Sequence, residues 1–205
     1  MNELVKAIKN FIVRDIIYII GGTSVIVSFL YLHGQLKMII STNTQTAVYF
    51  FVAGLSYPIG YCIQEIASIT RIVTTASYFD PWPILTRVYR RFTHEPWKDP
   101  YKKLGERENI VNKVKEDELR IQRYASERQM AEIERTISFM QLGTTLGPCG
   151  IVSSALILIR AICRNCCFDM WLFRTTLIIS VFLITMGWLK ALQLIRQKHD
   201  LAESL

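Results

Sequence analysis

The chain has 205 residues, of which 51% are hydrophobic and only 20% are charged, and its formal net charge is +7 at pH 7. This composition is too apolar for an ordinary water-soluble domain of that length. The sequence also has no Gly-rich phosphate loop, no His-Glu-x-x-His motif and no nucleophile matched to a base. We therefore expect no catalytic residues, no cofactor, no metal and no enzymatic activity.

The hydrophobic residues gather in four blocks, at 16–32, 46–64, 137–159 and 171–193. Each block is close to the roughly 20 residues that a helix needs to cross a membrane, and none is charged in its central part. The first block is too long for the apolar part of a cleaved signal peptide, which predicts a retained anchor. The sequence therefore predicts an all-α protein with a four-helix transmembrane region made of two helical hairpins.

The basic residues predict how the chain is oriented, because Lys and Arg are enriched in the cytoplasmic segments of membrane proteins. Fourteen of them lie between residues 71 and 136, whereas the two short outer loops hold only Lys37, Arg160 and Arg164. Both termini and the central segment are therefore expected to be cytoplasmic, with the chain in a cell membrane, most simply a bacterial inner membrane. The expected regions are an N-terminal transmembrane hairpin, a cytoplasmic helical insertion, and a C-terminal hairpin with a short tail, at 1–65, 66–136 and 137–205.

Residues 81–103 mix aromatic, basic and proline residues, which predicts a short amphipathic helix at the membrane interface. Trp and Tyr rings favour the headgroup level, and Arg side chains reach lipid phosphates. The predicted interface residues are Trp82, Arg87, Tyr89, Arg90, Arg91 and Trp97.

Two other interpretations of 81–103 are less favoured. Basic residues among aromatics can bind nucleic acid, but 71–136 balances its fourteen basic residues with eleven acidic ones. The spacing of Arg87 and His94 also fits the loose motif of some helical ribonucleases. Pro96 follows that His closely and would break the helix that such a site needs.

The charged segment from Gly105 to Thr136 contains no further Gly or Pro, which predicts one helix running unbroken into the third span. Its apolar heptad pattern is imperfect, because Asp117 and Arg128 fall in the seam. The pattern fits two structures equally well. One is a solvated helix held by ion pairs between its own turns. The other is a helix that packs against its copies in an oligomer, or against a partner protein.

Glycine and proline occur together in the second and third spans, in "GLSYPIG" and "GTTLGPCG". Small residues four apart let helix backbones approach closely, and proline kinks a helix. These residues are expected at a helix-packing surface or an oligomer interface, and they are Gly54, Pro58, Gly60, Gly143, Gly147 and Pro148. A second interpretation makes them the flexing points of a gated pore.

Four charged residues near the inner ends of the spans, Asp15, Glu65, Arg135 and Lys190, are expected to form a layer of ion pairs. Three cysteines lie in the outer loop between the third and fourth spans, at Cys163, Cys166 and Cys167. Free thiols, a disulfide and, less favourably, a metal site are all compatible with that spacing.

In size, span number and charged cytoplasmic insertion, the chain resembles the small multi-span membrane components of bacterial anti-phage defence systems, such as the membrane subunit of the two-gene Kiwa system. The resemblance includes no shared residue motif, so it implies no site residues. It implies a membrane sensor paired with a cytosolic DNA-binding effector.

We therefore expect a non-enzymatic homo-oligomer, for which a tetramer is our guess, that contacts membrane lipids and binds no nucleic acid itself. A cytosolic protein partner is expected to dock on 66–136. The alternative is a channel or membrane-permeabilising effector whose oligomer forms a pore.

Overall fold

The computed structural model describes residues 2–35, 45–70, 72–73, 83–93, 97–105, 107–164 and 167–205. These residues form helices and short connections with no strand, which confirms the all-α expectation for this part of the chain. The first helices are α1 (Asn2–Leu32), α3 (Gln45–Ile69) and α4 (Pro83–Thr93). They are followed by the 3₁₀ turn η1 (Lys102–Leu104) and by α5 (Arg107–Tyr124), α6 (Glu127–Arg164) and α7 (Cys167–Ser204).

Among the described residues, three helical segments are long and apolar enough to cross a membrane: Val13–Leu32 of α1, and the helices α6 and α7. The second predicted span, within α3, is not among them, so the arrangement of four spans in two hairpins is not established.

The predicted unbroken helix from 105 into the third span is wrong. The chain breaks between α5 and α6, at Ala125 and Ser126. The Ser126 N–H donates to the side-chain oxygen of Gln129 at 2.8 Å, and the Gln129 N–H approaches the Ser126 hydroxyl at 3.4 Å. This reciprocal pair is a capping box, and it begins a new helix at Glu127 by satisfying N–H groups that lack partners within the helix.

The end of α1 is formed by Gly34. Its φ of 73° lies in the left-handed region that glycine adopts without strain. The Gln35 N–H bonds to the carbonyl of Leu30, and the Gly34 N–H bonds to that of Tyr31. These two bonds form a Schellman motif, which closes the last turn of the helix.

The chain divides into two compact units. Unit 1 consists of Met1–Val73 and Gln141–Ile184, and unit 2 of Thr74–Met140 and Thr185–Leu205. Each of the long helices α6 and α7 contributes to both units. Residues 185–205 therefore group with 74–140, and the predicted division into 1–65, 66–136 and 137–205 stays a prediction.

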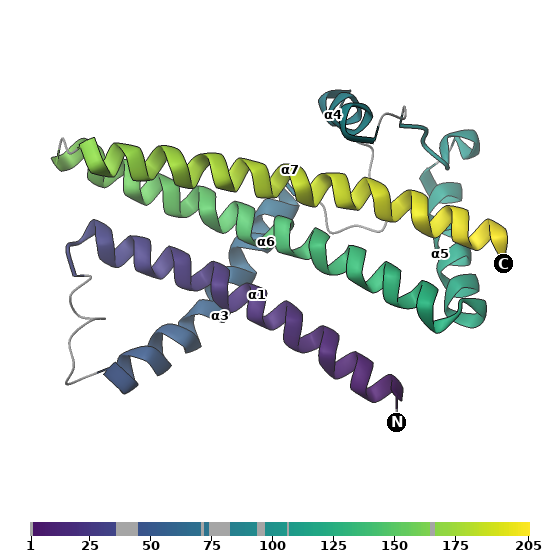
Figure 1. The fold of residues 1–205 in the computed structure, drawn as a ribbon, viewed down its shortest axis with the longest axis horizontal. Coiled ribbons are helices and arrows are strands. Elements are labelled where there is room, and N and C mark those ends of the chain that lie inside the picture. Colours follow the sequence, from purple (N-terminus) through teal and green to yellow (C-terminus); the bar gives the residue numbers. More distant parts are fainter. Residues whose placement is uncertain are drawn as a thin grey trace. The chain divides into compact units, whose positions relative to one another are not determined.

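Helices in unit 1 meet at small residues. A Cβ on Gly22 would overlap the carbonyl oxygen of Ser56, and one on Gly60 would overlap that of Tyr18. These contacts bring the backbones of α1 and α3 together where the two helices cross (Figure 1). Hydroxyl groups add to the contact, since the Thr23 and Ser56 oxygens lie 2.8 Å apart.

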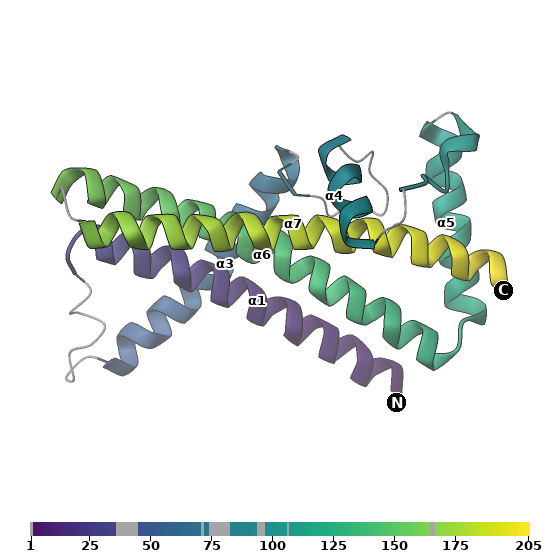
Figure 2. The same cartoon turned by 45° about the horizontal axis from the view of Figure 1, so that its top comes forward.

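The helices α6 and α7 run antiparallel, side by side, in unit 1 as they do in unit 2 (Figure 2). In unit 1 they approach at Gly147, where a Cβ would overlap the side chain of Ile184, and at Gly150, where it would overlap the Ser180 hydroxyl. Close backbone approach is thus the packing principle of this unit.

Unit 2 has a core of larger side chains. Ile121 of α5 and Ile133 and Met140 of α6 pack with Ala191 and Leu194 of α7. A second cluster joins Tyr101, Val114 and Ile195, with Trp97, Leu104 and Ile110 packed against it. These contacts hold α5 and the turn before it on the C-terminal part of α7.

Candidate functional site

The most unusual polar feature of unit 2 is a carboxylate inside its core. The side chain of Asp117, on α5, is only 4% exposed. The Tyr101 hydroxyl donates to its Oδ2 at 2.9 Å, and the Lys113 ammonium lies 3.3 Å from its Oδ1. A charge is costly in a protein interior unless it is paired and hydrogen-bonded, and both conditions are met here.

The fourth member of this group comes from α7. Nδ1 of His199 lies 3.5 Å from Oδ2 of Asp117, and its Nε2 lies 3.3 Å from Glu203. The imidazole ring packs edge-on against Tyr101, with 5.0 Å between ring centroids. Nδ1 is buried and makes no hydrogen bond to a described residue. We call Tyr101, Lys113, Asp117, His199 and Glu203 the Asp117 centre.

The environment favours the protonated forms of two groups in this centre. Burial raises the pKa of the Tyr101 phenol, and its hydrogen bond to Asp117 and the nearby acidic charges raise it further. Burial is the largest single influence on the pKa of Lys113 and lowers it, but the hydrogen bonds to Asp117 and Glu116 and the charges of these carboxylates together raise it overall. Tyr101 therefore stays protonated and donates its hydrogen bond, and Lys113 stays positively charged, beside the Asp117 carboxylate.

Further polar contacts tie the same two helices together. Lys198 of α7 donates to Glu118 of α5 at 2.7 Å. Arg120 of α5 donates to the carbonyl of Ala202 at 3.2 Å. These contacts fasten the end of α7 to α5.

The described residues of unit 1 include a buried ion pair. Nε of Arg160, on α6, donates to Asp169 of α7 at 3.2 Å, and the side chains are 13% and 4% exposed. The Tyr31 hydroxyl of α1 donates to the same carboxylate, and the Arg160 guanidinium lies 3.7 Å from the centre of the Tyr31 ring. These three residues join α1, α6 and α7. The expectation that Arg160 lies in a loop is wrong, because α6 continues to Arg164.

The predicted interface residues of 81–103 separate into two groups. Arg87, Arg90 and Arg91 are exposed on α4. Tyr89 is only 5% exposed and packs edge-on against Trp97, with 5.4 Å between ring centroids. The two rings therefore contact each other within unit 2, and the placement of these residues at the lipid headgroups stays a prediction. Trp82 and His94 lie outside the described residues.

The predicted packing glycines and prolines also separate. Gly60 and Gly147 contact neighbouring helices of the same chain, as described above, and Gly143 and Pro148 are buried. Gly54 has no atom within 4 Å of the place its Cβ would occupy, and Gly54 and Pro58 are both exposed. Most of this set therefore serves packing within one chain, and the face with Gly54 and Pro58 is left open.

The four residues of the predicted ion-pair layer are divided between the units. In unit 1, Asp15 lies 3.9 Å from Arg14. In unit 2, Lys190 donates to Gln193 at 2.8 Å. The charged groups of Arg135 and Lys190 lie over the ring of Phe139, at 5.8 and 6.0 Å from its centroid. The layer, which also includes Glu65, stays a prediction.

The cysteines of the outer loop are only partly described. Cys163 and Cys167 are free thiols, and Cys166 lies outside the described residues. Cys62 and Cys149 are free as well. The described part of the chain contains no group of His, Cys, Asp and Glu residues placed to hold a metal ion.

Comparison with known proteins adds no identification, because no protein-family model, no curated protein and no solved structure matches this chain.

Proposed function

We propose that this chain is a non-enzymatic, oligomeric membrane protein whose unit 2 is a docking platform for a cytosolic protein partner. The single observation that carries the proposal is the outer face of α5. Its inner face, with Val114, Asp117 and Ile121, is buried, yet Val111 and Leu119 are 42% and 64% exposed on the other side.

The outer face of α5 has the composition of a protein-binding surface. Val111, Lys115, Leu119 and Gln122 follow one another at helical spacing, and all are exposed. Two apolar side chains among polar neighbours give a partner a place to bury hydrocarbon with a polar rim around it. The Asp117 centre supports this role, because it holds α5 rigidly and so prepares the surface before binding.

The proposed topology places both termini and unit 2 in the cytoplasm of a bacterial cell, with α3 as a fourth span. The distribution of Lys and Arg supports it. So does the exposure of apolar side chains along α3, where Phe50, Ile66 and Ile69 are 77%, 61% and 79% exposed. With only three spans, the termini would lie on opposite sides of the membrane. Protease protection of N- and C-terminal tags in spheroplasts distinguishes the two arrangements.

The channel is the less favoured function. Several hydroxyl groups of unit 1 that could line a pore are packed between helices instead. Thr145 donates to Gln64 at 3.1 Å and is 1% exposed, and Ser56 and Thr144 are completely buried. A pore would have to form between subunits, along the open face of α3.

The partner is tested by affinity purification of the full chain from native membranes in a mild detergent, followed by mass spectrometry. We expect a stoichiometric cytosolic protein with the wild type, and its loss with Leu119→Asp. Tyr124→Asp is the matched control, since Tyr124 is 62% exposed on a different side of α5. Retention of the partner by Leu119→Asp would contradict the proposed surface. A clean oligomer without partner would favour the channel, and ion conductance in a planar bilayer would then test it.

A further inference from the structure

A second surface of unit 2 is strongly basic. Residues 83–93 and 97–105 contain six exposed basic side chains: Arg87, Arg90, Arg91, Lys98, Lys102 and Lys103. Asp99 is the only acidic residue in these two ranges, and its carboxylate accepts the N–H of Tyr101. None of the six basic side chains forms an ion pair with a described residue. We call this set the basic face.

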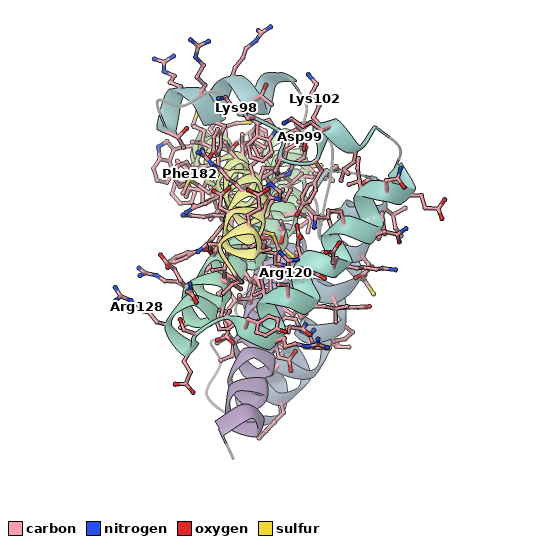
Figure 3. The ribbon with its side chains drawn as sticks, turned by 90° about the vertical axis from the view of Figure 1, so that its right-hand side faces the viewer. Lys98, Asp99, Lys102, Arg120, Arg128 and Phe182 are labelled. Atoms are coloured by element: carbon pink, nitrogen blue, oxygen red, sulfur yellow. The ribbon has the colours of Figure 1, made fainter. Side chains whose placement is uncertain are left out.

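The aromatic residues of this segment orient the basic face away from the core of unit 2. Tyr89 is buried against Trp97, and Trp97 packs on the cluster of Tyr101, Val114 and Ile195. The arginines of α4 therefore lie on the side of the helix that is opposite Tyr89. In the view of Figure 3, Lys98 and Lys102 appear in the upper part of the picture, whereas Arg128 projects from a different part of unit 2.

We propose that the basic face binds the anionic phospholipid headgroups of the membrane in which the chain is anchored. Arginine forks match the geometry of phosphate oxygens, and a polybasic segment next to a membrane span is drawn to an anionic leaflet. The three apolar helices keep the basic face near a bilayer, which raises the local concentration of its ligand. The proposal rests on the proposed function only for the placement of unit 2 at the cytoplasmic leaflet.

Single-stranded nucleic acid is a poorer ligand for this surface. Such binding relies on exposed aromatic rings on which bases stack. Tyr89 and Tyr101 are 5% and 2% exposed, so neither offers a ring face. The neighbouring helix α5 also exposes acidic residues, Glu108 and Glu116, which would repel a second polyanion contact.

The Tyr89 side of α4 packs against Trp97, and the arginines of the helix are exposed. The proposed contact of these arginines with lipid headgroups is electrostatic. It depends on headgroup charge, weakens with added salt, and is indifferent to the lipid acyl chains.

The test is native mass spectrometry of the full chain in detergent with equal amounts of phosphatidylglycerol and phosphatidylcholine. We expect the wild type to retain phosphatidylglycerol with a preference of about tenfold or more, since three or more basic residues contribute. The variant Arg87→Gln/Arg90→Gln/Arg91→Gln should lose most of this preference. The control Lys115→Gln/Arg123→Gln/Arg128→Gln removes the same charge from exposed positions elsewhere in unit 2 and should keep it.

Several results would overturn the proposal. They are equal retention of the two lipids by the wild type, an unchanged preference in the arginine variant, and an equal loss in the control. Displacement of phosphatidylglycerol by inorganic phosphate would identify a phosphate site that does not need a lipid, and displacement by an oligonucleotide would favour nucleic acid. Size-exclusion profiles of all variants show whether they fold. The assay needs neither a partner nor a particular topology, so its failure leaves the docking proposal standing.

Discussion

The two units of this protein hold their helices together by different means. In unit 1, Gly22 and Gly60 bring backbones into contact, and hydroxyl groups fill the remaining space. In unit 2, Ile, Val and Met side chains form the core, and one charged centre is built around Asp117. Lipid tails are as apolar as leucine, so close packing replaces the hydrophobic effect between helices in a membrane. In water, burial of large apolar side chains is the main driving force.

The largest expected effect comes from a substitution at Gly22, which tests whether backbone contact holds the helices of unit 1 together. Leucine there would overlap the backbone of Ser56, and the two helices cannot part without losing their other contacts. We expect no monodisperse protein after extraction of Gly22→Leu in detergent. Gly54→Leu is the matched control on α3, because nothing lies near that position, and it should purify as the wild type does. Equal behaviour of the two variants would show that backbone contact is not what holds unit 1 together.

The second-largest expected effect concerns the buried ion pair of unit 1. Arg160→Met leaves the Asp169 carboxylate buried beside Tyr31 without its cation, a loss of about 3 kcal/mol. At roughly 2–4 °C per kcal/mol, thermal unfolding in detergent should shift down by several degrees. The double variant Arg160→Met/Asp169→Leu should recover much of the shift. A double variant as unstable as the single one would mean that the pair contributes more than charge neutralisation.

The Asp117 centre of unit 2 should give an intermediate effect. Asp117→Ala removes the partner of Tyr101, Lys113 and His199 together, and we expect a loss of about 2 kcal/mol. Asp117→Asn keeps an acceptor for the Tyr101 hydroxyl and should lose about half as much. Glu116→Ala, which removes a 58% exposed carboxylate one residue away, should change the unfolding temperature very little. A loss with Glu116→Ala as large as that with Asp117→Ala would contradict the importance of burial.

The smallest predicted effect concerns the start of α6. Ser126→Ala removes one side of the capping box and should lower the free energy of unfolding by about 1 kcal/mol. Ser126→Asp keeps a capping oxygen and should remain close to the wild type. If both variants unfold at the temperature of the wild type, the break between α5 and α6 does not depend on this cap.

The helices and the apolar segments could be predicted from the sequence because both are local patterns. The break at Ser126 was also present as a local pattern, the four residues "SERQ", in which Ser and Gln have the spacing of a capping box. The absence of Gly and Pro predicts one long helix, whereas this box predicts the helix start that the structure has at Glu127. A charged residue in an apolar seam, at Asp117, was likewise a sign of a buried polar site.

The partners of these residues could not be predicted from a single sequence. His199 is far from Asp117 along the chain, and only the packing of α7 on α5 brings them together. Tyr31, Arg160 and Asp169 come from three helices, and no spacing rule connects them. Tyr89 and Trp97 have the composition of interface residues, and only the structure shows that Tyr89 is buried and that the two rings pack against each other.

The backbone contact at Gly22 also has a consequence for evolution. Most positions on a membrane helix can exchange one apolar residue for another, so the sequences of related chains drift apart quickly. Gly22 and Gly60 cannot be exchanged in this way, because any side chain would overlap the neighbouring helix. Distant descendants of the same ancestor should therefore keep these two glycines, together with the small residues at Gly147 and Gly150, after their other similarity has been lost. The spacing of these four positions is a signature by which such relatives can be recognised.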